Sequence, residues 1–285
     1  MNDIFNFRRF GLLISKDFRE NWKKYGLQFL TLFGIMAVWM TWNFYNRFQY
    51  LQKYPSNNEN IDIQLLQSLS ILFLGFGIFF ASTLMNPMRE KTMRISFLST
   101  PVSNFEKYIS RWLIVTIGYI IAFFIALWIA DVVRVAFMSY KYPEIGFKFI
   151  DFSRLVKPEI ENSSRNYAFF NKSYFILWVS IYALLQSLFL LGTTFWEKAS
   201  FIKTFSASAV IIFLYIYLNR IMIQIFNHDI NSFGGKFSYY VSNLLNNPSD
   251  NDVMLLSTCI FIFITIFCWV IAFFRFRESE IINRL

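Results

Sequence analysis

The sequence is poor in the residue types that build catalytic and metal centres. It has one histidine, His228, and two cysteines, Cys259 and Cys268, among 285 residues. A lone histidine excludes a histidine cluster for a metal ion. The cysteines share one apolar run, where a helical rise of about 13 Å between them forbids a disulfide. No nucleophile with a matching base is evident, so we expect no enzyme activity and no cofactor on this chain.

Charge is also scarce, at 16% of residues against about 25% in soluble domains. The mean hydropathy of +0.42 requires apolar surroundings. Six apolar runs have about the 20 residues needed to cross a bilayer, and as continuous runs they indicate helices rather than barrel strands. The sequence predicts an all-α polytopic membrane protein whose transmembrane domain, 25–285, has six transmembrane helices: 25–44, 65–86, 112–130, 173–195, 205–225 and 253–274.

Residues 1–24 carry charges throughout and lack a signal-peptide cleavage pattern, so we expect the first span to stay in the protein. Their pattern is that of a basic amphipathic helix at the inner leaflet. Its apolar residues are interleaved with cations: Ile4, Phe7, Phe10 and Leu13 against Arg8, Arg9, Lys16, Arg19 and Lys23.

Lysine and arginine counts favour cytoplasmic N- and C-termini, because that orientation puts 16 of these residues inside and 10 outside. The net charge of +9 is then concentrated on the cytoplasmic segments, where anionic lipid is its natural partner. No nucleic-acid partner is required to explain it. Arg220 is the only charge within a predicted span, and both a snorkelling and a buried functional arginine remain open. The long outer loop, 131–172, is either a small aromatic cap or a solvated loop. Asp131 and Arg134 are spaced for an ion pair within a helix.

The segment 87–111 lies between the second and third spans, on the predicted cytoplasmic side. Pro101 disfavours helix at the preceding residue, so a helix should end near Ser99. Ser103 and Glu106 form a capping box, which predicts a new helix start. An apolar face then recurs at helical spacing, at Phe105, Ile109 and Trp112. The segment is predicted to be a helix, a sharp turn and a second helix.

This segment resembles the signature of type-2 ATP-binding-cassette (ABC) exporter permeases, a Glu-Lys-(Gly)-Thr stretch followed by Leu-x-Thr-Pro-Val-Ser. Six spans, an N-terminal amphipathic helix and cytoplasmic termini fit the same family plan. The glycine usual after Glu-Lys is absent here, and the outer loop is longer than is typical. The matching residues are Arg89, Glu90, Lys91 and Thr92, then Leu98, Ser99, Thr100, Pro101, Val102 and Ser103.

The resemblance implies that the segment is a coupling helix docked on a separate cytoplasmic ATPase, in the inner membrane of a bacterium. It also implies a second permease subunit, identical or related, with ATP and Mg bound by the ATPase. No P-loop occurs here, since Gly234-Gly235-Lys236 lacks both the first glycine and the Ser/Thr. The alternative is a non-transporting membrane assembly or immunity protein that docks a cytoplasmic partner. The candidate coupling residues are Arg89, Glu90, Lys91, Thr92, Arg94, Leu98, Thr100, Pro101, Ser103 and Glu106.

Weakly polar residues in the second and fourth spans indicate either helix packing or a substrate pathway. The amides Gln67 and Gln186 are the better pathway candidates, because a buried amide is costly to leave unpaired. Ser68 and Ser187 lie beside them and complete the set.

Overall fold

In the computed structural model, the described residues are 5–54, 61–85, 95, 97, 99–156, 168–169, 171–196, 199–226 and 250–281. Most of them are helical, which confirms the predicted all-α class. The predicted coupling residues Arg89 to Arg94 and Leu98 lie outside the described residues, as does the Arg220 side chain. The principal helices are α1 (Phe7–Lys53), α2 (Ile61–Ala81), α4 (Asn104–Leu113), α5 (Tyr119–Lys141), α6 (Lys172–Phe195), α7 (Ser200–Phe226) and α9 (Asp250–Ile281).

Within the described residues, five helical stretches are long and apolar enough to cross a membrane. By helix length and hydropathy the chain is therefore a multi-pass membrane protein. The predicted span 205–225 lies within the helix α7, whose described apolar part is Ser200–Leu214. The five stretches are Phe7–Lys53, Ile61–Ala81, Asn104–Lys141, Lys172–Phe195 and Met254–Glu278.

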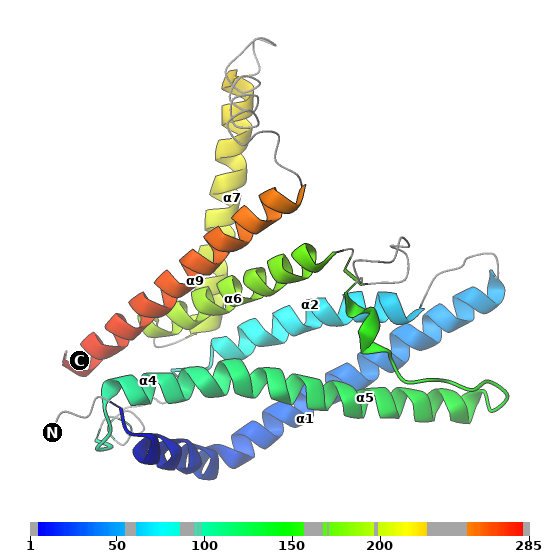
Figure 1. The fold of residues 1–285 in the computed structure, drawn as a ribbon, viewed down its shortest axis with the longest axis horizontal. Coiled ribbons are helices and arrows are strands. Elements are labelled where there is room, and N and C mark those ends of the chain that lie inside the picture. Colours follow the sequence, from blue (N-terminus) through cyan, green and yellow to red (C-terminus); the bar gives the residue numbers. More distant parts are fainter. Residues whose placement is uncertain are drawn as a thin grey trace.

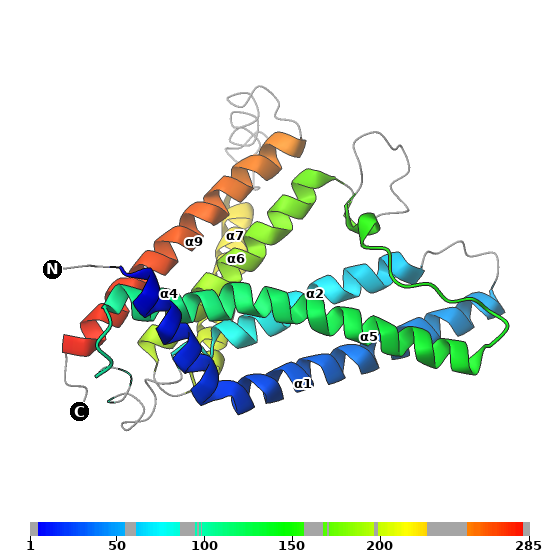
Figure 2. The ribbon, with the colours of Figure 1, turned by 60° about the horizontal axis from the view of Figure 1, so that its bottom comes forward.

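Helix α1 joins the predicted amphipathic helix and the first span in one element of 47 residues. It begins after Asn6, whose side chain accepts a hydrogen bond from the Arg8 N–H at 3.0 Å. Figure 2 shows that the first turns of α1 run in a different direction from the rest of the helix. The two predicted segments are thus distinct in direction but continuous in backbone hydrogen bonding.

The helices form one layered bundle from which α7 diverges (Figure 1). Helix α1 packs along α5, and α6 packs along α9. The start of α1, helix α4 and the end of α9 lie at the same end of the molecule (Figure 1). One apolar core joins α1, α2 and α5 around Met36, Phe73 and Phe123, and a second joins α4, α6 and α9 around Leu190 and Phe276.

A short π-helix, η2 (Ile114–Gly118), separates α4 from α5. In it the Thr116 hydroxyl donates to the Trp112 carbonyl at 2.6 Å. π-Helical turns in α-helices are rare and are frequent at functional sites. The long helix made by α4, η2 and α5 therefore has one irregular position along its membrane-spanning part.

Helix α5 continues to Lys141, beyond the predicted span end at residue 130. This extension contains a buried ion pair: the Arg134 side chain is 1% exposed and its Nε lies 2.7 Å from Asp131 Oδ1. Arg134 also donates to the Lys148 carbonyl at 2.9 Å, and Asp131 accepts from the Ile150 N–H at 2.9 Å. The predicted pair is confirmed, and it fastens the following loop to α5.

In the described part of the predicted loop 131–172, some residues pack onto the helices, whereas Phe149 and Phe152 are exposed. Ile150 and Ala168 are buried in the first core, and a short 3-10 helix, η3, spans Phe152–Leu155. At its start the Asp151 carboxylate accepts hydrogen bonds from the Ser153 hydroxyl and N–H, which hold its pKa below the usual range.

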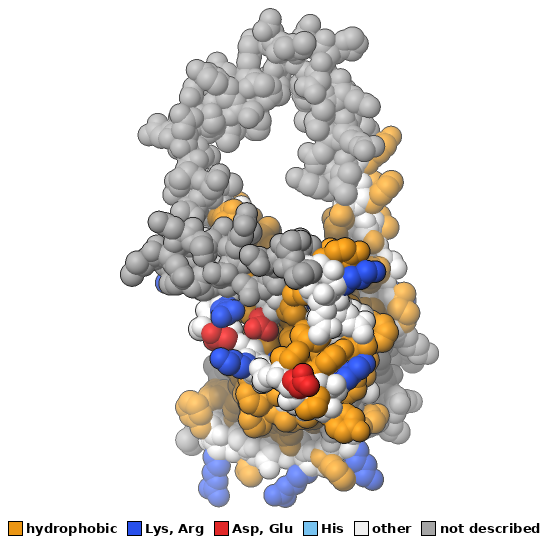
Figure 3. All heavy atoms as spheres, turned by 90° about the vertical axis from the view of Figure 1, so that its right-hand side faces the viewer, with side chains coloured by type: hydrophobic (Ala, Val, Ile, Leu, Met, Phe, Trp, Pro, Cys, Tyr) orange, Lys and Arg blue, Asp and Glu red, His pale blue; other side chains and the backbone are white. Residues whose placement is uncertain are grey.

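Viewed from the end where α1 and α5 finish, apolar side chains are exposed between scattered charged ones (Figure 3).

Candidate functional site

The turn before α4 has the predicted form. Ile95 and Phe97 are helical, and the Ser99 N–H donates to the Ile95 carbonyl at 2.9 Å. The Thr100 hydroxyl donates to the Phe97 carbonyl at 2.9 Å, directly before Pro101. The helix that contains Ile95 and Phe97 therefore ends near Ser99, as Pro101 predicts.

The predicted capping box at the start of α4 is also confirmed. The Ser103 hydroxyl accepts from the Glu106 N–H at 3.2 Å, and Glu106 Oε2 accepts from the Ser103 N–H at 3.2 Å. These bonds satisfy two backbone donors that a helix start leaves unpaired. Helix α4 thus has a fixed first residue.

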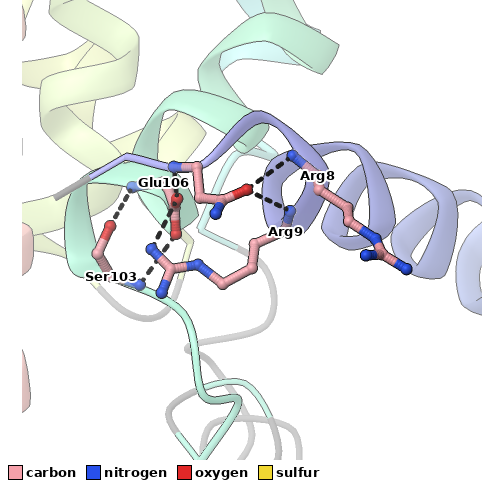
Figure 4. A network of polar contacts seen from close by, with 5 residues as sticks. Arg8, Arg9, Ser103 and Glu106 are labelled. Atoms are coloured by element: carbon pink, nitrogen blue, oxygen red, sulfur yellow. Dashed lines mark hydrogen bonds and ion pairs between the residues drawn. The ribbon is translucent and has the colours of Figure 1, made fainter. Parts of the chain in front are cut away.

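Glu106 also joins α4 to the start of α1. Its Oε1 accepts from the Asn6 N–H at 2.6 Å and from Arg9 Nη2 at 3.1 Å (Figure 4). The Glu106 side chain is 0% exposed, whereas that of Arg9 is 39% exposed. One buried carboxylate therefore holds the N-termini of two helices together. No local spacing signals this contact, because about a hundred residues separate its partners.

A second ion pair joins the same helices, this time with the acid on α1 and the cation on α4. Asp17 of α1 pairs with Arg111 of α4, and both side chains are largely buried. The Asp17 carboxylate also accepts from the Tyr25 hydroxyl at 2.6 Å and from Asn21 Nδ2 at 2.8 Å. The Arg111 guanidinium lies 5.3 Å from the Phe97 ring centroid, so this pair reaches the segment before Pro101.

The other face of α4 packs on α9. Phe105 and Trp112, of the predicted apolar face, contact Phe273 and Trp269 with ring centroids 5.9 and 5.1 Å apart. The Tyr108 hydroxyl donates to the Trp269 carbonyl at 3.1 Å. Helix α4 is thus fixed both to the first helix of the chain and to the last.

The four predicted pathway residues are not gathered in one place. Gln67 donates to the Ala168 carbonyl at 3.4 Å, near the loop end of α2, and the Ser68 hydroxyl donates to the Leu65 carbonyl at 2.8 Å. The Ser187 hydroxyl donates within its own helix, to Leu184. Of the four, only Gln186 lines the apolar cleft described next.

The cleft has a volume of ≈ 510 Å³ and lies between α2, η2, α5 and α6. Loop residues such as Phe152 border it at one end, and Trp112 and Trp269 border it at the other. None of the described residues that line it is charged. Three buried polar atoms on its lining residues have no hydrogen-bond partner among the described residues: Tyr182 Oη, Gln186 Nε2 and Trp269 Nε1.

Comparisons with protein-family models, curated proteins and solved structures give no match. Among the described residues, no group of three or more His, Cys, Asp or Glu side chains could hold a metal ion. The class that fold and composition define is a multi-pass α-helical membrane protein. Its two candidate sites are the α4 junction with α1 and α9, and the apolar cleft.

Proposed function

We propose that the chain is the membrane permease subunit of an ABC-type exporter in a bacterial inner membrane. A separate ATPase would dock on residues 88–106 of the segment 87–111 and supply the ATP hydrolysis, with ATP and Mg on that subunit. The observation that supports this proposal best is the attachment of α4 to both α1 and α9. An element that receives a motor's displacement must be stiff and must be joined to the helices that move.

The contacts of α4 suit such transmission. Glu106 and Arg111 bind α1 on one side, and Tyr108 binds the α9 backbone on another. The docking motif precedes this helix by a few residues, and Phe97 packs against Arg111 and Phe276. A push on the segment before Pro101 would therefore shift α4 and both of its neighbours together.

A second permease subunit fits the exposed apolar surface of α7. This helix diverges from the bundle (Figure 1), and Ile211 and Phe213 are about two-thirds exposed. In a membrane such a surface is covered by lipid or by another helix. Two copies, or one copy with a relative, would complete the exporter, with both termini in the cytoplasm.

Co-purification tests the docking. The full chain is co-expressed with the P-loop ATPase that we expect in the neighbouring reading frame, and the complex is captured on the permease. Replacing Glu90 and Arg94 by alanine should reduce captured ATPase about tenfold or more, because their charges fix the register of docking. The matched control, Lys16→Ala with Glu20→Ala, removes one cation and one anion from an exposed pair on α1 and should retain the complex.

Transport is measured on the same complex. If residues 98–103 are replaced by glycine and the ATPase stays bound while ATP-driven export stops, the coupling role is supported. Equal capture and export after both sets of changes would overturn it. A bound partner that lacks a P-loop would instead favour the non-transporting assembly or immunity protein.

A further inference from the structure

A shallow groove between α1 and α5 lies outside both candidate sites. Its α1 wall runs from Ala37 to Tyr45, its α5 wall contains Val133 and Phe137, and its volume is ≈ 380 Å³. None of the described residues that line it is charged. Trp42 is 64% exposed on one wall and Phe137 is 44% exposed on the other, so the groove faces away from the bundle. In a membrane it is therefore open to lipid.

One cation closes the end of the groove at which α5 finishes. The exposed Lys141 Nζ lies 3.9 Å from the Tyr45 ring centroid and donates to the Tyr45 hydroxyl at 2.7 Å. Gln49 donates to the same hydroxyl, so the hydroxyl hydrogen and the other ammonium hydrogens remain as donors. Within the described residues, no carboxylate lies at ion-pair distance from Lys141. The cluster therefore suits a ligand that supplies an anionic acceptor.

The position of Lys141 along its helix indicates which anion it meets. It ends the helical stretch Asn104–Lys141, in which the rise from Arg111 onward is about 45 Å. A bilayer with its head-group regions is about 40–45 Å thick. Because Arg111 pairs with Asp17 at the opposite end, the Lys141 ammonium lies at the level of the lipid phosphates. The groove beside it then lies at the level of the acyl chains, with Trp42 near the interface that tryptophans prefer.

We propose that this groove binds one phospholipid of the adjacent leaflet, with its phosphate accepting hydrogen bonds from Lys141 and Tyr45 and one acyl chain lying between Trp42 and Phe137. A phosphodiester offers acceptors and a negative charge, which matches donors that have no acid beside them. A helix of a second copy fits worse, because Ser200–Leu214, the described apolar part of α7, has no carboxylate for Lys141. This binding does not depend on the proposed function.

Photolabelling of the purified full chain tests the binding without any ATPase. The protein is placed in phosphatidylcholine nanodiscs with a trace of phosphatidylglycerol whose acyl chain carries a diazirine, or of a diacylglycerol with the same chains. Labelled peptides are mapped by mass spectrometry, and labelling of the groove is divided by labelling of the exposed α9 residues Phe263 and Phe267, which any lipid reaches. We expect this ratio to be about tenfold higher for phosphatidylglycerol, because only that probe has the phosphate.

Variants locate the phosphate contact. Lys141→Gln with Tyr45→Phe removes the charge and the hydroxyl but leaves the groove walls, and it should abolish the preference for the phosphatidylglycerol probe. The matched control is Lys53→Gln with Tyr54→Phe. It alters a lysine that lies 5.7 Å from the centroid of a tyrosine ring at the end of α1 but does not border the groove, and it should keep the preference.

Equal labelling of the groove by both probes in the unaltered chain would overturn the proposal, and this comparison does not depend on whether a variant folds. An equal loss in the control pair would also overturn it, since charge at this end would then act without the groove. Displacement of the phosphatidylglycerol probe by inorganic phosphate would do the same, because the site would then bind a free anion rather than a lipid.

Discussion

The two carboxylate oxygens of Glu106 serve different helices. Oε2 caps its own helix, and Oε1 binds the start of α1 through Asn6 and Arg9. These contacts define Glu106 as a residue that positions α4 within the chain. Its contact with an ATPase stays a prediction, as do those of Thr100, Pro101 and Ser103.

Gly77 is a second residue whose surroundings dictate its type. A Cβ at this position would lie 2.5 Å from Tyr182 Cε2 and 3.2 Å from Tyr119 Cε1. Both rings pack on Phe73 one turn earlier, and the Tyr119 hydroxyl donates to the Phe73 carbonyl at 2.7 Å. The absence of a side chain at Gly77 therefore allows α2 to lie close to α5 and α6.

Gly77→Ala should destabilise the protein by about 1–3 kcal/mol, because two packed rings must move. Gly75→Ala is the control on the same helix, since a Cβ there meets nothing within 4 Å. It should be neutral or stabilising by up to about 1 kcal/mol, from helix propensity. The measurement is unfolding of the purified protein in mixed detergent micelles. Equal effects of the two changes would contradict the close approach at Gly77.

At the scale of elements, the start of α1 depends on α4. Three polar links join them: the Asn6 N–H and Arg9 to Glu106, and Asp17 to Arg111. The apolar residues Phe7, Leu12 and Trp22 in this part of α1 are exposed, so they contribute little packing within the chain. The polar links therefore add to the apolar contacts of Leu13 and of Phe5 with Phe105 in holding the first turns.

Replacing Glu106 and Arg111 together by alanine should loosen these first turns. Each lost hydrogen bond between charged groups is worth about 1.5–3 kcal/mol, so amide exchange over residues 8–24 should accelerate about tenfold or more. Hydrogen exchange with mass spectrometry measures this. The pair Lys16→Ala with Glu20→Ala, on the exposed side of the same helix, should leave exchange unchanged. Unchanged exchange in the first variant would show that other contacts hold the helix.

Local sequence patterns predicted the parts of this region that depend on near neighbours. The helix end before Pro101, the capping box and the ion pair of Asp131 with Arg134 each involve residues within a few positions, and all three are confirmed. The link from Arg9 to Glu106 joins residues 97 positions apart, which no spacing rule reaches. For the same reason, the sequence placed Gln186 in a span but could not show that Tyr182 and Trp269 share its cleft.

At the scale of the whole molecule, the start of α1 and the end of α9 lie together, and the loop after α5 lies at the opposite end (Figure 1). This arrangement agrees with alternating passes across the membrane. The lysine and arginine counts predict that the end with α4 is cytoplasmic. Cysteine labelling distinguishes the two orientations.

On a background without Cys259 and Cys268, Glu144→Cys should react with a membrane-impermeant maleimide in intact cells. Glu20→Cys should react only after the membrane is permeabilised. Both positions are exposed in the folded chain, so burial does not limit either reaction. Reaction of Glu20→Cys in intact cells, with Glu144→Cys protected, would invert the proposed topology.

The π-helix η2 sets the rotational phase between the two halves of one long helix. Glu106 must face α1 at one end, and Arg134 must face Phe44 and the loop at the other, where its guanidinium lies 4.4 Å from the Phe44 ring centroid. An α-helix turns about 100° per residue. A π-helical turn holds one residue more than an α-helical turn. Deleting one residue between Ile114 and Gly118 would therefore return this turn to α-helix and leave both ends facing their partners, whereas a deletion in the α-helical part between Tyr119 and Ala130 would turn Arg134 away by about that angle. The π-helix is thus a place where this long helix can change its length by one residue and keep both contacts.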